Sequence, residues 1–170
     1  MRQIDSSTVT PVTVRRCVEG EWSEVRRLHI QMALGVPLAV DVELNDVFAT
    51  PDSYWQHFTS ACALGKDQVL FVADVEQACV GMGHVRIDHD VARPSMLYVN
   101  EAERRRGIGS ALLTAQEQWA RDAGLHDLVG HIPDTSAATT LAKRFGWQRT
   151  EELYTAKNRL VERRWTKRLT

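Results

Sequence analysis

A glycine-rich turn in the middle of this 170-residue chain has residue types and spacing suited to an anionic ligand. The turn, RRRGIG at 104–109, follows the apolar run LYV at 97–99 and precedes an amphipathic stretch. Glycine lets the backbone approach a ligand closely, and the first N–H groups of a helix have no partner within the helix. Because these N–H groups and the helix dipole attract anions, and the arginines add positive charge, the turn is typical of a phosphate or pyrophosphate site.

Two other glycine motifs, the P-loop and the dinucleotide-binding pattern, fit these residues less well. A P-loop needs Lys and then Ser or Thr after its last glycine, whereas Ser110 follows Gly109 directly. The dinucleotide-binding pattern GxGxxG needs a third glycine where Leu112 stands. Both motifs are excluded, and the remaining alternative is that the glycines only start a helix packed tightly on its strand.

The turn resembles the acetyl-CoA signature of the GCN5-related N-acetyltransferase (GNAT) superfamily. That signature is Gln or Arg, two residues, Gly, one residue, then Gly or Ala, and the segment 104–109 fits it. The segment TSAATTLAKRFGW at 135–147 is similar to the family's second cofactor-side helix, which ends in a Gly-aromatic pair. The resemblance, which covers about residues 12–168, implies an acetyl-CoA-dependent N-acetyltransferase that transfers the acetyl group directly to a primary amine.

The resemblance also implies where acetyl-CoA binds. In this family the strand before the signature diverges from the next strand, and the pantetheine arm lies in the gap, here between Val99 and His131. The backbone of residues 97–99 would pair with pantetheine, and the amides of residues 104–110 would hold the pyrophosphate. The acetyl-CoA-binding residues predicted in this way are Leu97, Tyr98, Val99, Arg104, Arg105, Arg106, Gly107, Ile108, Gly109, Ser110, Thr135 and Ala138.

The sequence departs from the family pattern at several positions. Glu101 stands where the family usually has Pro, and Arg105 stands where it usually has Gly. The second cofactor-side helix normally begins with Asn and carries a Tyr that protonates the departing thiolate, but Thr135 and Ala142 occupy these positions. These two departures support one alternative to a small-molecule acetyltransferase, an acyl-CoA-binding sensor or regulatory module without turnover. A protein N-acetyltransferase is a further alternative, which an open acceptor groove would favour.

Catalysis needs a group that removes a proton from the amine, because an amine with a pKa near that of Lys, about 10.4, is mostly protonated at neutral pH. A strand hairpin turning at 89–93 would place His84 opposite Tyr98, and His131 would lie across the gap. Both histidines are candidate bases, and Tyr154 is a candidate proton donor. The alternative is a half-buried, hydrogen-bonded strand histidine in each case, and a packed or rim tyrosine.

An acidic segment indicates the class of acceptor. No Lys or Arg occurs between Arg27 and Lys66, and the segment contains four carboxylates, Asp41, Glu43, Asp46 and Asp52. The family resemblance places this region beside the acceptor, so the carboxylates favour a small cationic amine. The alternative is an ordinary solvated loop and helix face.

Composition narrows the remaining choices. The net charge of −1 provides no general attraction for nucleic acid or an anionic membrane, and no apolar run is long enough to span a bilayer. The N-terminus lacks a signal-peptide pattern, so we expect a cytoplasmic protein. Cys17, Cys62 and Cys79 lack CxxC spacing, which predicts reduced thiols and no metal site. Homodimers are common in similar proteins, and no residue pattern here tests that state.

The elements that would position these residues follow from hydrophobic periodicity and turn residues. We expect one α/β (α+β mixed) domain at 12–170 after a frayed N-terminus at 1–11. Its central sheet would be twisted, mostly antiparallel and split at the acetyl-CoA site, with helices on both faces. Strands are predicted at 12–15, 68–75, 79–88, 95–99, 127–132, 148–156 and 160–169. Helices are predicted at 22–33, stopped by Gly35 and Pro37, and at 51–62, 108–123 and 134–145, with Thr50 as an N-cap of the second.

Overall fold

The computed structural model describes residues 10–35, 43–134, 136–155 and 161–170. The predicted N-terminal extension therefore lies largely outside the described residues. The elements are β1 (Val12–Arg16), α1 (Trp22–Gly35), α2 (Leu44–Ala49), α3 (Asp52–Leu64), β2 (Gln68–Val75), β3 (Ala78–Asp88), β4 (Val91–Val99), the 3-10 turn η2 (Glu101–Glu103), α4 (Ile108–Asp122), β5 (Asp127–Pro133), α5 (Ser136–Arg144), β6 (Gln148–Thr155) and β7 (Val161–Arg168). The predicted order is confirmed, with α2 and the 3-10 turn added.

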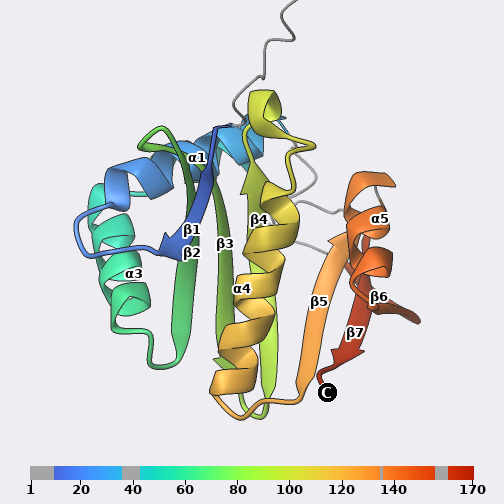
Figure 1. The fold of residues 1–170 in the computed structure, drawn as a ribbon. Helices are drawn as coiled ribbons and strands as arrows, with labels where there is room; N and C mark the ends of the chain where they lie inside the picture. The colour runs from blue at the N-terminus through green and yellow to red at the C-terminus, as the bar shows by residue number, and fades with distance from the viewer. Residues whose placement is uncertain (1–9, 36–42, 135, 156–160) are drawn as a thin grey trace, which may run out of the picture.

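The strands form a seven-stranded sheet in the order β1-β2-β3-β4-β5-β7-β6. Every neighbouring pair is antiparallel except β4 and β5, which are parallel. Figure 1 shows α4 crossing in front of the sheet and α5 beside it, over β5 and its neighbours. The prediction of a mostly antiparallel sheet is confirmed.

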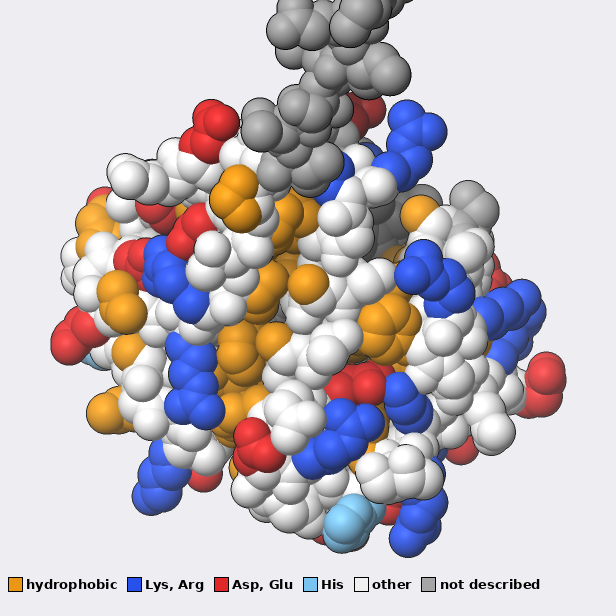
Figure 2. Space-filling view, in the orientation of Figure 1, with side chains coloured by type: hydrophobic (Ala, Val, Ile, Leu, Met, Phe, Trp, Pro, Cys, Tyr) orange, Lys and Arg blue, Asp and Glu red, His pale blue; other side chains and the backbone are white. Residues whose placement is uncertain are grey.

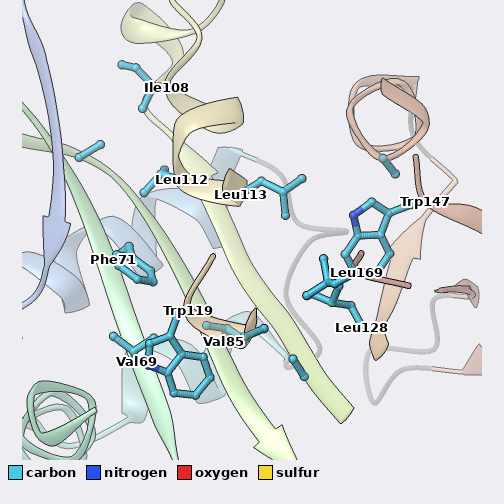
Figure 3. Close-up of a cluster of buried hydrophobic side chains, with 14 of the residues drawn as sticks. Val69, Phe71, Val85, Ile108, Leu112, Leu113, Trp119, Leu128, Trp147 and Leu169 are labelled. Atoms are coloured by element: carbon cyan, nitrogen blue, oxygen red, sulfur yellow. The ribbon is translucent and has the colours of Figure 1, made fainter. Parts of the chain in front are cut away.

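Two apolar clusters, one on each face of the sheet, explain why helices cover both faces. Strand β2 is buried on both sides, so Phe71 packs in the cluster with α4 while Leu70 packs in the cluster with α1 and α3. Figure 3 shows the first cluster, in which Trp119 of α4 lies beside the strand residues Val69 and Val85. Burial of this kind stabilises by about 25 cal/mol per Å² of apolar surface, so the central strands form a rigid platform for the site.

The surface carries charges of both signs (Figure 2), and the cysteines are mostly buried. Acidic and basic side chains are interspersed on the face shown in Figure 2. Cys17 and Cys62 are buried, Cys79 is half-buried, and all three are free thiols. Burial raises the pKa of Cys62 to about 12, which keeps this thiol protonated. No helix within the described ranges is both long enough and apolar enough to cross a membrane.

The start of the second predicted helix is corrected by the structure. Thr50 is not its N-cap: Thr50 ends α2 and its Oγ1 donates a hydrogen bond to the carbonyl of Asp46 at 2.8 Å. The residue preceding α3 is Pro51, which offers no side-chain cap. Helix α2 escaped prediction because it is six residues long and buries only Val47, which leaves no periodicity to detect.

The turn between β3 and β4 is shorter than predicted, and β4 is longer. Asp88 pairs with Val91, so the turn consists of His89 and Asp90, and β4 begins four residues earlier than the predicted strand at 95–99. His89 adopts a left-handed φ of 58°. The turn prediction at 89–93 is therefore wrong in length, because the run VARP extends the strand despite its proline.

A β-bulge changes the register inside this hairpin. His84 pairs with Ser95 because the turn has two residues instead of the predicted five, so the predicted alignment of His84 with Tyr98 is wrong. Beyond His84 the bulge shifts the pairing, and Tyr98 lies opposite Met82. Between these pairs, one residue of β3 opposes two residues of β4, at 96 and 97. A bulge of this type inserts one residue, bends the strand and cannot be read from alternation alone.

Candidate active site

The sheet opens between its two parallel strands. Strands β4 and β5 pair only at Val91 with Asp127 and at Ala92 with Leu128. Beyond these two pairs they separate, and Figure 1 shows β5 leaning away from β4. The facing edges of two separated strands offer backbone N–H and C=O groups to an extended ligand, as an edge strand does. This is the split that the sequence analysis predicted.

A cavity of about 1480 Å³ runs through the split. It is lined by β4 at 93–99, the turn before α4, part of α5, the end of β5, and residues of α1 to α3. Most of the predicted acetyl-CoA-binding residues line it: Leu97, Tyr98, Val99, Arg104, Arg105, Gly107, Ile108, Gly109, Ser110 and Ala138. Thr135 lies outside the described residues. Arg106 is not part of this lining.

The turn before α4 has the conformation that an anion site requires. Gly107 is the N-cap of α4 with φ +80°, a left-handed conformation that L side chains rarely adopt. A Cβ at Gly107 would meet no atom within 4 Å, so conformation rather than space explains this glycine. No side chain caps the helix, which leaves its first N–H groups directed at the turn without a side-chain acceptor.

The three arginines of the turn have different surroundings. Arg104 donates from Nε to the carbonyl of Val99 at 3.0 Å and lies 5.9 Å from the centroid of the Tyr98 ring. Arg106 forms an ion pair with Glu103 and donates to the carbonyl of Thr10 at 2.7 Å, away from the cavity.

Arg105 lines the cavity and makes neither a hydrogen bond nor an ion pair with any described side chain. It also has a left-handed φ of 63°. The family's preference for glycine at this position therefore has a backbone explanation, and this chain places an arginine in a strained conformation there.

His84 lies at the β3–β4 bulge, and both of its ring nitrogens are occupied. Nδ1 is 2.9 Å from Ser95 Oγ, and Nε2 is 3.1 Å from Gln68 Oε1. The side chain is 5% exposed, and burial, with a smaller effect from the charge of Arg86, lowers its pKa to about 4. His84 is not part of the cavity lining described above, and this geometry matches the alternative of a hydrogen-bonded strand histidine.

His131 and Tyr154, by contrast, both line the cavity. Their rings are stacked, with centroids 4.6 Å apart and planes 14° from parallel. Strand β7 lies between the two strands that carry them, and Glu162 of β7 pairs directly with Tyr154. Glu162 is buried and also lines the cavity.

One wall of the cavity is formed by residues of α1, α2 and α3. Tyr54 and Phe58 lie parallel, with planes 2° apart and centroids separated by 6.3 Å, and both line the cavity. His29 lines it too: its Nδ1 is buried without a partner, and burial lowers its pKa to about 4. The α3 part of this wall is aromatic and consists of Tyr54, Trp55 and Phe58.

The predicted acidic segment contributes less to the cavity than expected. Asp41 lies outside the described residues. Asp46 is the one carboxylate among the other three that lines the cavity, and Asp52 forms an ion pair with Arg26 at 3.7 Å. Two arginines of the β3–β4 hairpin, at 86 and 93, line the same cavity directly opposite each other, so charges of both signs face it.

Sequence reasoning missed several cavity residues. Gln116 is fully buried on α4, and Glu162 is buried on β7. A signal for Gln116 was present, because it is four residues after Leu112 and thus a polar residue on the apolar face of the helix. Glu162 had no comparable signal. Within the described ranges, no group of three His, Cys, Asp or Glu side chains is arranged to hold a metal ion.

Comparison with known proteins gives a family and a fold. The model of the acetyltransferase (GNAT) family matches residues 39–147. A search of curated proteins found no match. Many solved structures resemble this chain, among them three acetyltransferases from bacteria.

A putative acetyltransferase from Salmonella typhimurium, solved with its cofactor acetyl-CoA, has a TM-score of 0.78 at 17% identity, with 95% of each chain covered. A phosphinothricin acetyltransferase from Sinorhizobium meliloti, solved with acetyl-CoA, has a TM-score of 0.78 at 16% identity, covering 93% of this chain and 88% of that chain. A ribosomal-protein-alanine N-acetyltransferase from Brucella melitensis has a TM-score of 0.71 at 21% identity, covering 92% and 99%. Identities this low establish a shared fold alone.

Proposed function

This protein belongs to the acetyltransferase (GNAT) family, whose model matches more than half of the chain, and on that premise we propose that it transfers the acetyl group of acetyl-CoA to a primary amine of a small molecule. One observation carries the proposal: a cavity runs through the β4–β5 split and joins the glycine turn before α4 to the His131–Tyr154 pair. The two ends of the cavity thus have the chemistry that a cofactor and an acceptor need.

The residues of the split fit acetyl-CoA. Gly107 and the uncapped N-terminus of α4 suit the pyrophosphate, and Arg105 adds a cation that is not used elsewhere in the described chain. The unpaired edges of β4 and β5 beyond Ala92 suit the amides of the pantetheine arm. When bound, acetyl-CoA supplies an activated acetyl thioester, so no covalent bond to the protein is needed.

Proton transfer is assigned to the stacked pair. We expect His131 to accept the proton that the acceptor ammonium must lose, and Tyr154 to provide a hydroxyl proton in place of the tyrosine that Ala142 replaces. Ala142 is buried and lines the cavity, so a proton donor at that position is replaced by a methyl group. A role for His84 as a base stays a prediction without support from the cavity geometry.

The acceptor is expected to be small because the aromatic wall of α3 and the β3–β4 hairpin both face the cavity. The cationic acceptor predicted from the acidic segment now depends on Asp46. Arg93 is ion-paired with Asp88, which also lines the cavity, so Arg86 is the hairpin arginine that would favour a negative group on the acceptor. The panel of amines should therefore span polyamines, aminoglycosides and amino acids. A cytoplasmic location and a homodimer stay predictions.

The test combines binding and turnover in one sample. Calorimetric titration with acetyl-CoA measures its Kd, and a free-thiol assay then measures CoA release with each amine. Binding together with amine-dependent thiol release supports the proposal and identifies the acceptor class. Binding of acetyl-CoA without thiol release, either with the small amines or with peptides that have a free N-terminus, supports the acyl-CoA sensor. Release with peptides alone supports a protein N-acetyltransferase.

A further inference from the structure

The β4 bulge is held by a side chain from the helix in front of it. Met96, one of the two bulge residues, has φ 53°, a left-handed conformation that is strained for a side chain of this kind. Such a conformation persists only when the surroundings enforce it, and it occurs most often at functional sites. Residues 93–99 all line the cavity in succession, whereas a regular strand would direct alternate residues away.

Gln116 of α4 is the residue that contacts the bulge from this side. Its Nε2 donates to the carbonyl of His84 at 2.6 Å and reaches the carbonyl of Ser95 at 3.4 Å. These two residues face each other across β3 and β4, immediately beside the bulge. One side-chain amide therefore bridges both strands at the point where the regular pairing of the strands is interrupted.

Packing alone does not explain a glutamine at this position. Gln116 is fully buried on the apolar face of α4, yet its Oε1 has no hydrogen-bond partner. A buried acceptor without a partner costs about 1–3 kcal/mol, and an apolar side chain of the same shape would avoid that penalty. The amide is therefore retained for what its nitrogen does at the bulge.

Gly83 is adapted to this amide. It is the β3 residue opposite the bulge, and a Cβ there would lie 3.2 Å from both Cδ and Nε2 of Gln116 and 3.3 Å from Oε1. Any other L-residue at position 83 would press on the amide group itself. The glycine thus leaves the space in which Gln116 reaches the two carbonyls.

We propose that Gln116 is a positioning residue for acetyl transfer, which fixes the backbone of Met96 and Leu97 at the cavity wall through its hydrogen bonds to the His84 and Ser95 carbonyls. The inference rests on the proposed acetyl transfer, because it is the edge of β4 at the split that would face the acetyl group. Gln116 acts through the bulge and contacts neither the pyrophosphate turn nor the His131–Tyr154 pair.

The test uses Gln116→Met, which keeps the length of the side chain and removes both its donor and its unpartnered oxygen. We expect kcat to fall by about 100-fold, the effect of a small misplacement at a reacting centre. KM and the calorimetric Kd for acetyl-CoA should change by less than about 3-fold, and the midpoint of thermal unfolding should change little, because removal of the unpartnered oxygen offsets the loss of the donor to the two carbonyls. Gln118→Met is the matched control: this exposed glutamine of the same helix bonds Asp122 at 2.8 Å.

A second variant tests the same contact from the other strand. Gly83→Ala should displace the amide and lower kcat similarly, and the double variant with Gln116→Met should be no worse than either single one. An unchanged kcat in Gln116→Met overturns the proposal. A fall in kcat accompanied by equal losses in Kd and thermal stability also overturns it, because that pattern indicates a purely structural role.

Hydrogen exchange distinguishes failure of the proposed function from failure of the role proposed for Gln116. If the wild-type protein releases no thiol with any amine, acetyl transfer is refuted, but the amides of Met96 and Leu97 still report on the bulge. Faster exchange of these amides in Gln116→Met than in Gln118→Met supports the proposal that Gln116 fixes the bulge, and equal exchange overturns it.

Discussion

The imidazole of His131 lies flat against the phenol ring of Tyr154, with the ring centroids 4.6 Å apart. The contact spans β7, since His131 belongs to β5 and Tyr154 to β6. It brings two groups that can carry protons onto one wall of the cavity. Aromatic contacts of this kind contribute about 0.5–1.5 kcal/mol beyond their burial, so each ring orients the other.

Removal of either proton-carrying group should reduce turnover more than binding. We expect His131→Ala to lower kcat by about 100-fold or more and to remove the rise of rate with pH that deprotonation of a histidine base produces. Tyr154→Phe keeps the stacked ring and loses only the hydroxyl, so it should lower kcat without changing that pH dependence. Steady-state kinetics across pH measure both effects.

His57→Ala controls for loss of an imidazole, because His57 is exposed on α3 and its Nδ1 contacts the carbonyl of Ser53. This variant should match the wild type. If the pH–rate profile of His131→Ala coincides with that of the wild-type protein, His131 is not the base.

Gly107→Glu should abolish acetyl-CoA binding. The substitution adds negative charge and a side chain at the N-terminus of α4, where the phosphates are expected, in a conformation with φ +80°. Gly124→Glu is a close control, since Gly124 has φ +76°, an equally open surrounding, and lies at the opposite end of α4. Calorimetry should show normal binding for Gly124→Glu and none for Gly107→Glu, and retained binding in the latter would refute the assignment of the phosphate turn.

The elements and the glycine turn before α4 were predictable because their signals are local. Apolar residues such as Leu112 and Trp119 repeat with helical period, and Gly107 stands where a backbone turn needs it. The turn prediction depended on six consecutive residues and their neighbours, and the structure places most of them on one cavity.

The remaining features depend on contacts between residues far apart in the sequence. The register of His84 depends on the two-residue turn, which places Asp88 opposite Val91 and so His84 opposite Ser95, and the bulge shifts only the pairs beyond His84, such as Met82 with Tyr98. The stacking of His131 on Tyr154 depends on the insertion of β7 between β5 and β6, which no local pattern encodes. Gln116 acts across two strands from a helix, so only the packed structure shows what its amide contacts.

Acid should destabilise the protein partly through His84. An exposed histidine of the unfolded chain titrates near pH 6.5, whereas burial and Arg86 lower the pKa of His84 in the folded state to about 4. Between these values the unfolded state binds more protons, so this contribution to stability is complete above about pH 6.5 and is lost as the pH falls towards 4. The loss amounts to at most about 3 kcal/mol.

His84→Gln should weaken this dependence. Urea unfolding at about pH 7 and about pH 5 should show a smaller difference in free energy for the variant than for the wild-type protein, by about 2 kcal/mol. Part of the dependence should remain, because burial lowers the pKa of His29 to about 4 as well. His126→Gln is the control, since the side chain of His126 is exposed; an equal change in both variants would contradict the assignment.

Two substitutions of Arg105 separate its backbone strain from its charge. Arg105 has φ 63° and lines the cavity. Arg105→Gly and Arg105→Ala both remove the cation, so both should bind acetyl-CoA more weakly, with a smaller dependence on salt than the wild-type protein. Only glycine adopts a left-handed φ without strain, so Arg105→Gly should be more stable than Arg105→Ala by about 1 kcal/mol. Chemical denaturation measures the stability of the two variants, and equal stability would show that the backbone at 105 is not strained. Calorimetry at two salt concentrations measures their affinity for acetyl-CoA, and unchanged affinity would remove Arg105 from the phosphate site.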